Sequence, residues 1–589
     1  PGLARAAAFW SAAPMRHRHA GSFEAASTKP TPAGGRARPA GWSLAISFVL
    51  AGLIVSAVMA VRSTGVHHED DLAHLQIARW AWQHPAYLLD DWGRPGFTAL
   101  YALPGLGWLP ARLFSGLLTA ASAWLAYLVA VKLRVRLAVF VPLFLWIQPL
   151  SFTLSYTTLT ETALAFYLSL ACWLYVRGRF AWSAAAISLC AITRHEAALF
   201  LVMWLAALLY RARPAREWIW VFWAPLLHNL LAFAFLHEWP LKLLLQPRPT
   251  SEYGQGSLLT MIVLWVLAAG FGTLLLAIIG APVLARRRGG LLFVSSAAAY
   301  VAAHSVMYGF GLFGSGGYAR FLVPAGPIVA VSAAAALSEY RRAWRRWAVG
   351  PQNLPLLNVN AIGAAAVIVF WGAAGLELHR LRADLIINHL EWTVPLLHAA
   401  ALMLMLLFFT VLVLSSQQNM ARPTLALAVL PITALAAALL QPLAVSTIPR
   451  PFRQCAPLQL TDREKAHRTA AQIARAATGS LSDHQTTGAA IFSASPWIDE
   501  FVGRVRPPDE PDLAQRWESS RAGDVLIWDA RHAASPRHRL PLSALTADPD
   551  LVELWRSTGD AYEPVYCAVF QKRPQREAPR QRPEATGPN

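Results

Sequence analysis

Apolar residues in this chain come in long blocks, and this pattern constrains the fold more than any other feature. The blocks run for about 14 to 27 residues and are separated by short polar loops. A helix needs roughly 20 apolar residues to cross the hydrocarbon core of a bilayer, so most blocks match a span. With 56% hydrophobic and 14% charged residues, the 589-residue chain is too apolar for an ordinary soluble protein. The sequence therefore predicts a polytopic α-helical membrane protein.

Thirteen apolar segments are candidate spans. In chain order they are Trp42–Val61, Leu113–Val131, Leu137–Thr153, Leu159–Val176, Phe180–Ile192, Ala197–Tyr210, Trp218–Leu236, Leu258–Leu284, Leu291–Phe310, Phe321–Leu337, Asn360–Leu376, Val394–Leu414 and Thr424–Val445. Two of them, Phe180–Ile192 and Ala197–Tyr210, have only about 14 residues each, which is short for a full span. They form either two tilted spans or a re-entrant hairpin, so we expect about 11–13 transmembrane helices.

The basic residues orient these segments in the membrane. Six loops fall on one side of the predicted topology, and five of them are dense in Lys and Arg. The five are Lys132–Arg136, Arg177–Arg179, Arg211–Arg216, Arg286–Arg288 and Arg341–Arg346, and the sixth is Ser415–Arg422. The positive-inside rule places these loops and the N-terminus in the cytoplasm. Membrane topology thus accounts for the formal charge of +18, and we expect no nucleic-acid partner.

Composition divides the chain into four parts. Residues 1–40 are predicted to be a disordered, basic, cytoplasmic tail, and residues 41–448 the transmembrane part of a protein of the cytoplasmic membrane. Residues 449–572 have the composition of a small soluble domain, which an odd number of spans places on the extracytoplasmic side. Residues 573–589 are predicted to be a second disordered tail.

The soluble domain is predicted to be α/β. Thr461–Ala477 has helical spacing and opens with a Thr N-cap. Three short apolar runs are predicted strands: Ala489–Ser493, Asp524–Trp528 and Val565–Phe570. Cys455 and Cys567 both fall in this part, where an oxidising compartment allows them either to form a disulfide or to stay free.

The first predicted extracytoplasmic loop, residues 63–112, carries a cluster of acids directly after the first span. Glu69, Asp70 and Asp71 are consecutive, and adjacent carboxylates raise each other's proton affinity. Such a group can accept the proton of an attacking hydroxyl in sugar transfer. Two alternatives are a divalent cation held against a donor phosphate and a solvated loop that caps the next helix. No HExxH or CxxC metal pattern is present, so we predict no protein-bound metal site.

An acidic pair soon after the first span, then a helix and a Pro-containing return to the membrane, resembles the GT-C superfamily of integral membrane glycosyltransferases. This superfamily includes protein O-mannosyltransferases and aminoarabinose transferases, and its motif is commonly Asp-Glu followed by an aromatic three residues after the Glu. Here Asp70-Asp71 take the positions of the pair and His74 that of the aromatic. The resemblance implies that Asp70 is the catalytic base and Asp71 its neighbour, and we expect Asp71 and Glu69 to be catalytic residues of the same cluster.

The polar return segment is Asp90-Asp91-Trp92-Gly93-Arg94-Pro95. From the same resemblance we expect His74 and Asp91 on the acceptor side of the site and Arg94 on the donor side.

Three further segments carry candidate donor-binding residues. Gly309–Pro327 resembles the Arg-aromatic segment that these transferases place near a lipid-linked donor, and we expect Tyr318 and Arg320 to bind the phosphate. Arg194 and Glu196 lie at the end of a span, where they form either part of this site or a structural salt bridge. The loop 237–257 contributes Lys242 and Arg248, which either cover the donor entrance or lie at the membrane interface.

The sequence thus predicts inverting transfer of a sugar from a polyprenyl-phosphate donor to a glycan, lipid or protein acceptor on the extracytoplasmic face. A transporter or lipid flippase is the alternative. The charged residues cluster on one face and are scarce in mid-span, where transporters keep their sites, and this favours the transferase. A third possibility is an envelope-assembly scaffold whose catalytic site has decayed.

Overall fold

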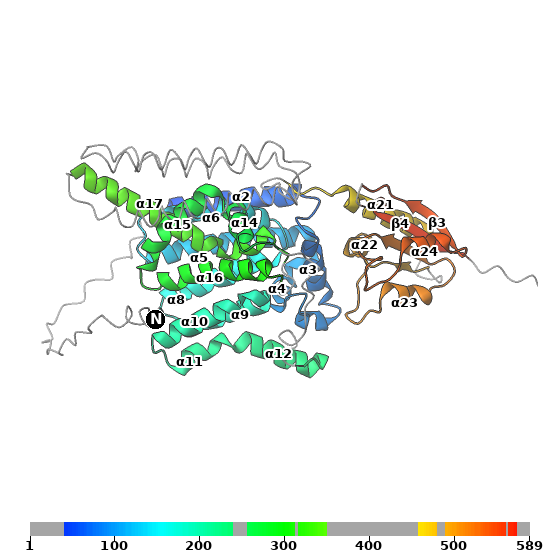
Figure 1. The fold of residues 1–589 in the computed structure, drawn as a ribbon, viewed down its shortest axis with the longest axis horizontal. Helices are drawn as coiled ribbons and strands as arrows, with labels where there is room; N and C mark the ends of the chain where they lie inside the picture. The colour runs from blue at the N-terminus through cyan, green and yellow to red at the C-terminus, as the bar shows by residue number, and fades with distance from the viewer. Residues whose placement is uncertain are drawn as a thin grey trace, which may run out of the picture. The chain divides into compact units, whose positions relative to one another are not determined.

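The computed structural model describes residues 41–239, 256–312, 316–349, 457–479, 489–560 and 563–573. From Ser43 onward these residues belong to one unit by their contacts. They form a helical part between Trp42 and Val349, blue to green in Figure 1, and an α/β domain between Pro457 and Arg573, yellow to red.

The helical part contains long helices joined by short ones. In order they are α2 (Trp42–Arg62), α3 (Glu69–Trp80), η1 (Pro85–Leu89), α4 (Pro95–Tyr101), η2 (Pro104–Leu106), α5 (Trp108–Lys132), η3 (Ala138–Phe140), α6 (Val141–Trp146), α7 (Pro149–Leu154), α8 (Thr160–Val176), α9 (Phe180–Thr193), η4 (His195–Ala197), α10 (Ala198–Tyr210), α11 (Ala215–Trp218), η5 (Ile219–Val221), α12 (Trp223–Leu236), α14 (Thr260–Ala269), α15 (Phe271–Ala285), α16 (Gly290–Gly309), η6 (Ala319–Ala325) and α17 (Gly326–Val349).

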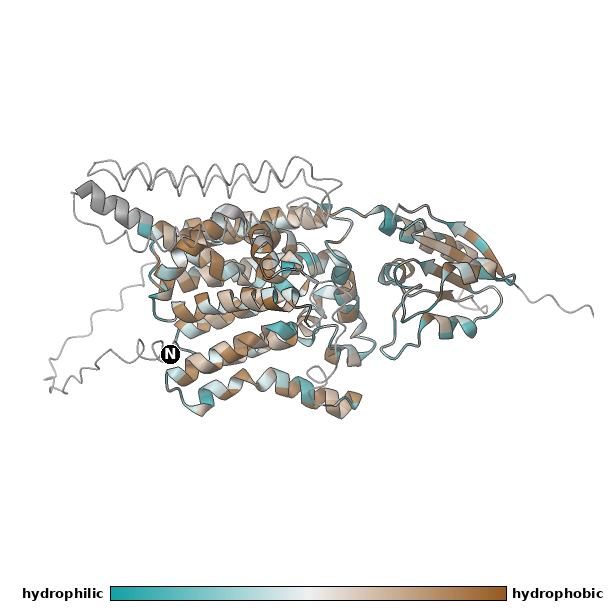
Figure 2. Ribbon diagram, viewed as in Figure 1, coloured by the Kyte–Doolittle hydropathy of each residue, from teal (hydrophilic) through white to brown (hydrophobic). Residues whose placement is uncertain are grey.

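Several of these helices are long and apolar enough to cross a membrane. Within the described ranges they are α2, α5, α16 and the continuous η6–α17 segment Ala319–Glu339, and two bent helix pairs raise the number from four to six. Figure 2 shows the apolar colour along much of these helices. The predicted spans Asn360–Leu376, Val394–Leu414 and Thr424–Val445 lie outside the described residues.

Three predicted spans are interrupted, and one of them, Trp218–Leu236, bends by 54° between η5 and α12. Leu137–Thr153 becomes η3, α6 and α7, because Pro142 and Pro149 each start a new helix at a position where the missing N–H costs nothing. Leu258–Leu284 bends by 106° between α14 and α15. Gly270 makes this bend with a φ of 79°, which a residue without Cβ adopts readily. The short segments Phe180–Ile192 and Ala197–Tyr210 form two separate helices, α9 and α10.

Close helix packing holds the helical part together. α15 lies along α17, and α8 packs between α5 and α9. At the α15–α17 contact, a Cβ on Gly280 would lie 1.8 Å from the backbone oxygen of Ser332, so no larger residue fits there. Small residues at such crossings let helix backbones approach closely, which is the usual way that helices associate in lipid.

The α/β domain has a four-stranded sheet with helices on both faces. Its helices are α21 (Asp462–Ala477), α22 (Pro496–Val502), α23 (Leu513–Glu518) and α24 (Leu542–Ala547), and its strands are β1 (Ile491–Phe492), β2 (Val525–Asp529), β3 (Leu551–Arg556) and β4 (Cys567–Lys572). The sheet order is β1-β2-β4-β3, with β1 parallel to β2 and the other pairs antiparallel. The predicted helix and three predicted strands are present, whereas β3 was not predicted.

The central strand β2 is buried on both faces. Val525 and Ile527 face a cluster with α21 and α22, while Leu526 and Trp528 face a second cluster with α23 and α24. This alternation is the period of two that a strand imposes, and it explains a continuous apolar run in the sequence. Cys567 is a buried free thiol in the first cluster, and Cys455 lies outside the described residues.

The start of α21 shows how a local signal fixes a boundary. The Thr461 side chain accepts the N–H of Glu464, and the Glu464 carboxylate accepts the N–H of Thr461 at 2.5 Å. This capping box satisfies two backbone donors that the first helical turn leaves unpaired, so the helix begins where the sequence predicted.

Candidate active site

Helix α3 places three consecutive acids at its first turn. Negative side chains are favourable there, because the unpaired N–H groups of the first turn carry partial positive charge. The His68 ring caps the helix: its Nδ1 lies 3.2 Å from the Asp70 N–H and 3.3 Å from Asp70 Oδ2, and the protonation of Nδ1 decides which contact forms. Glu69, Asp70 and Asp71 then point to three different partners.

Asp70 pairs with Arg320, which lies 250 residues further along the chain. Arg320 Nη2 donates to Asp70 Oδ2 at 2.5 Å, and the Arg320 side chain is 4% exposed while that of Asp70 is 24% exposed. Burial raises the pKa of Asp70, but the His68 hydrogen bond and the Arg320 charge outweigh burial and hold that pKa well below its usual range. Asp70 is therefore an ionised carboxylate at neutral pH.

Arg320 sits at the start of η6, between aromatic rings and a second acid. Its guanidinium carbon lies 4.8 Å from the ring centre of Tyr318 and 5.4 Å from that of Phe321. Its Nε is 3.6 Å from Oε1 of Glu161, which is too long for a hydrogen bond. Within the described part of the chain, the buried Nε and Nη1 of Arg320 have no hydrogen-bond acceptor. Two nitrogens, which carry three N–H donors, thus remain able to bind a ligand.

A buried charge network continues from Arg320. Glu161, at the start of α8, has no exposed surface and accepts from Arg194 Nη1 at 2.6 Å. Arg194 Nε donates to Glu196 Oε1 at 2.5 Å, and its guanidinium carbon lies 4.4 Å from the centre of the Phe321 ring. The network has three carboxylates and two guanidinium groups, so its net charge is about −1 when all are ionised. An anion bound at Arg320 would compete with Asp70 in particular, because Asp70 is the carboxylate at the exposed end.

The predicted donor residues are partly brought together. Tyr318, Arg320, Arg194 and Glu196 all lie in or beside this network. Lys242 and Arg248 lie outside the described residues. Glu161 was not predicted, although a single acid at the start of an apolar run is a recognisable signal, since a charge at membrane depth is costly unless it is paired or functional.

Asp71 faces the interior of the protein instead of the network. Its Oδ1 accepts the Thr158 N–H at 2.6 Å, and its Oδ2 accepts the His67 N–H at 2.9 Å. Burial raises its pKa, and these backbone hydrogen bonds oppose that rise. With both oxygens occupied, Asp71 joins α3 to the start of α8, and this geometry favours a structural role over the predicted catalytic one.

Asp71→Asn is expected to lower the free energy of unfolding by about 1–3 kcal/mol, because the new amide NH₂ must face a backbone N–H donor. Thermal unfolding of the purified protein in detergent measures this loss, and the rate per folded molecule should change little. A stable Asp71→Asn protein without activity would instead place Asp71 in the chemistry.

Glu69 points to the α/β domain. Its Oε2 lies 2.7 Å from Arg531 Nη1, and its Oε1 lies 3.2 Å from His532 Nε2. The structure therefore separates Glu69 from the Asp70–Arg320 pair, although the three acids are adjacent in sequence.

The two predicted acceptor-side residues lie on different segments and have different neighbours. His74 is one turn after Asp70, and its ring centre lies 5.6 Å from that of Trp92 and 5.7 Å from that of Phe97. Burial lowers the pKa of His74 to about 4, so its ring is neutral at neutral pH. Asp91 Oδ1 lies 3.8 Å from His228 Nε2.

Arg94 approaches the same region in an unusual backbone conformation. The Arg94 backbone has a φ of 61°, which residues other than Gly rarely adopt. Its side-chain Nη1 lies 2.7 and 3.0 Å from the two ring nitrogens of His195. Within the described ranges, no three His, Cys, Asp or Glu side chains are arranged to hold a metal ion. A requirement for a divalent cation, brought in with a donor phosphate, stays a prediction.

Comparison with known proteins identifies the fold. No family model matches this sequence, and no curated protein matches it. The crystal structure of ArnT from Cupriavidus metallidurans bound to undecaprenyl phosphate is similar, with a TM-score of 0.54 and 15% sequence identity over 90% of this chain and 98% of that chain. This chain has a GT-C-like fold. The apo structure of the same ArnT has a TM-score of 0.47 and 15% identity, over 90% of this chain and 97% of that chain.

The GT-C-like fold confirms the fold class that was predicted from the apolar blocks and the first loop: a polytopic helical membrane protein with a small C-terminal domain. The likeness spans nearly the whole length of both chains, so it includes the helical part and the α/β domain together.

Proposed function

We propose that this chain is a glycosyltransferase that moves a sugar from a polyprenyl-phosphate donor to an acceptor hydroxyl on the extracytoplasmic face of the cytoplasmic membrane. The observation that carries the proposal is Arg320, a buried guanidinium that pairs with Asp70 and keeps two further nitrogens, Nε and Nη1, for an anion. The similar ArnT structure contains undecaprenyl phosphate, which is a lipid of the proposed donor class.

Donor binding and base activation are coupled in this mechanism. The donor phosphate binds Arg320 through two N–H groups, since a guanidinium matches phosphate oxygens in a bidentate contact. It thereby competes with the Asp70 carboxylate for the same cation. Asp70 is then released towards the acceptor, and its pKa rises because it has lost the charge of Arg320. Binding of the donor therefore makes Asp70 a better base.

The transfer step is a single displacement at the anomeric carbon. The acceptor oxygen forms a bond to this carbon as its proton passes to Asp70, and the bond from the anomeric carbon to the phosphate oxygen breaks. The electron pair of that bond stays on the phosphate, where Arg320 stabilises the developing charge. Attack from the face opposite the phosphate inverts the anomeric configuration. A glycan, a lipid or a protein can supply the hydroxyl, with His74 and Asp91 on its side of the site.

The proposal is tested with the purified full chain in liposomes that contain a polyprenyl-phosphate sugar. We expect sugar to reach an added acceptor extract and free polyprenyl phosphate to form in equal amount. Cells that lack the protein should accumulate the polyprenyl-phosphate sugar. Movement of the donor across the bilayer without cleavage of the sugar–phosphate bond would establish the flippase instead.

Arg320→Lys is expected to raise the KM for the donor about 10- to 100-fold, because an ammonium group replaces the bidentate contact with a single point of charge and loses a hydrogen bond worth about 1.5–3 kcal/mol. Initial rates at varied donor concentration measure this change. Arg287→Lys is the matched control, since Arg287 makes a half-exposed pair with Glu339 at 3.7 Å. An unchanged KM in Arg320→Lys would remove Arg320 from donor binding.

A further inference from the structure

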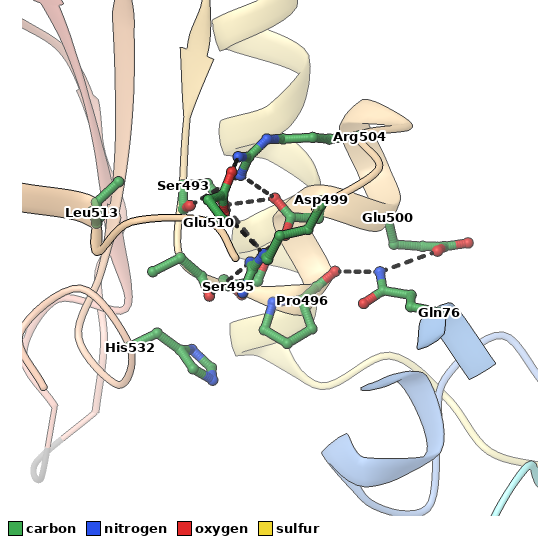
Figure 3. Close-up of polar contacts among 12 residues, drawn as sticks. Gln76, Ser493, Ser495, Pro496, Asp499, Glu500, Arg504, Glu510, Leu513 and His532 are labelled. Carbon is green, nitrogen blue, oxygen red and sulfur yellow. Dashed lines mark hydrogen bonds and ion pairs between the residues drawn. The ribbon is translucent and has the colours of Figure 1, made fainter. Parts of the chain in front are cut away.

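A carboxylate of the α/β domain contacts the helix that carries Asp70. Glu500, on α22, accepts hydrogen bonds from Arg79 Nη1 at 3.0 and 3.1 Å and from Trp108 Nε1 at 2.7 Å. Gln76 Nε2 lies 3.3 Å from the same carboxylate and donates to the backbone oxygen of Pro496 at 2.8 Å. Figure 3 shows Gln76 between Pro496 and Glu500. Gln76 and Arg79 both belong to α3, the helix that begins at Glu69.

A second polar contact holds the other end of α3. Glu69 contacts Arg531 and His532, which lie two and three residues after the end of β2. His532 Nδ1 is 2.9 Å from Asp529 Oδ1, while its Nε2 faces Glu69, so each ring nitrogen meets a carboxylate. Two carboxylates accept but do not donate, and both contacts are therefore hydrogen bonds only when His532 is a charged imidazolium. The hydrogen bond with Asp529 and the charge of Glu69 outweigh the effect of burial and raise the pKa of His532.

Apolar contacts fill the space between these two polar points. Trp497, on α22, packs in a cluster with Val66 and Leu72, and its ring stacks on that of Trp108 with 6.4 Å between ring centres. Val505 packs against a second cluster that includes Ile77 and Trp80 of α3. The contact therefore combines buried apolar surface with charged hydrogen bonds, as stable interfaces do.

The neighbouring acid Asp499 has different partners from Glu500. Asp499 is fully buried and pairs with Arg504 and Arg506 of its own domain. Figure 3 shows Asp499 directed to Arg504 and Ser493, whereas Glu500 is directed to Gln76. Asp499 thus forms ion pairs within the α/β domain, whereas Glu500 forms its ion pair with α3.

We propose that the α/β domain is a clamp that positions Asp70 by holding α3 at both ends, with Glu500 as its main positioning residue. The inference rests on the proposed function, in which Asp70 is the base. Asp70 follows Glu69 directly, and Gln76 and Arg79 lie two to three turns further along, so the two contacts fix both the tilt and the rotation of α3. Proton transfer requires the base within hydrogen-bond reach of the hydroxyl, and a displacement of about 1 Å can lower a rate about 100-fold.

Glu500→Gln in the full chain tests this clamp. The amide keeps an oxygen for Trp108 Nε1 but loses the charged pair with Arg79, and we expect kcat to fall about 10- to 100-fold with the donor KM within about twofold. Glu553→Gln is the matched control, because Glu553 is an acid of the same domain that pairs with the exposed Arg556 on β3. If the two residues act through their shared contact, Arg79→Gln should lower kcat similarly, and the double variant should be no worse than either single one.

Hydrogen exchange provides a readout that does not depend on sugar transfer. The α3 amides, residues 69–80, should exchange faster in Glu500→Gln than in the wild type or Glu553→Gln, in the same detergent micelles. Wild-type transfer with an unchanged kcat in Glu500→Gln would overturn the clamp, and so would unchanged exchange in α3. Absence of transfer by the wild type would overturn the proposed function, while the exchange comparison would still decide whether Glu500 holds α3.

Discussion

Asp70→Asn is expected to lower kcat for sugar transfer by about 10²- to 10⁴-fold, which is the usual contribution of a general base. The carboxamide has nearly the same shape as the carboxylate but cannot take the proton of the acceptor hydroxyl. The side chain is 24% exposed and lies at the edge of the charge network, so the protein should remain folded in the membrane. Steady-state transfer by purified protein in liposomes, compared at equal amounts of folded protein, measures the loss.

The same variant should bind the donor more tightly than the wild type. In the wild type the Asp70 carboxylate already pairs with Nη2 of Arg320 and repels an incoming phosphate, whereas the neutral amide carries no charge to compete for that cation. Equilibrium binding of a polyprenyl phosphate to the two proteins measures this effect. A fall in kcat together with a lower Kd is specific to a base that is also the resting partner of the phosphate-binding arginine.

Asp90→Asn is the control for Asp70→Asn. Asp90 is an acid of the same loop, and its Oδ1 accepts the Gly93 N–H at 2.6 Å, a contact that an amide oxygen reproduces. We expect wild-type kcat and donor affinity from this variant. Full activity of Asp70→Asn would remove Asp70 from the mechanism.

The depressed pKa of Asp70 also determines how the ion pair responds to acid. A carboxylate whose pKa is lower in the folded than in the unfolded chain adds stability above its unfolded pKa of about 4. This contribution is lost as the pH falls below about 4 towards the folded pKa. Near neutral pH the Asp70–Arg320 pair is intact, so Asp70 is held in the ionised form.

Glu161→Gln is expected to lower the free energy of unfolding by about 3 kcal/mol. Removal of one partner from a buried ion pair leaves the other charge uncompensated, which costs about 3–5 kcal/mol, and the remaining pair of Arg194 with Glu196 favours the lower value. The variant should also lose most of its transfer activity, because Arg194 and Arg320 no longer have a carboxylate between them. Thermal unfolding in detergent and transfer at low temperature measure the two effects separately.

Glu217→Gln is the control for Glu161→Gln. Glu217, on α11, pairs with Arg213, which precedes that helix. The Arg213 side chain is 34% exposed, and exposed pairs contribute only about 0–1 kcal/mol. We expect its unfolding temperature to stay close to that of the wild type. Equal stability of the two variants would mean that the buried network contributes no more than a surface pair.

The sequence predicted much of this architecture because the relevant signals are local. A helix forms all its backbone hydrogen bonds within one segment, so block length and capping residues are enough to place α5, α8, α9 and α21. The interrupted helices could not be predicted in the same way, because the position of each break depends on whether a Pro or Gly bends the chain. Pro149 and Gly270 do so, and neither effect follows from apolar content.

The partners of the site residues depended on tertiary structure. Glu69, Asp70 and Asp71 are consecutive, yet one contacts the α/β domain, one pairs with Arg320, and one binds the backbone at the start of α8. Successive helical side chains point about 100° apart, so neighbours in sequence must meet different surroundings. The sequence by itself determined that an acid cluster, an arginine and a scaffold of apolar helices were available. Helix packing decided that the acid and the arginine lie in contact, because the residues that form the charge network come from segments up to 250 positions apart.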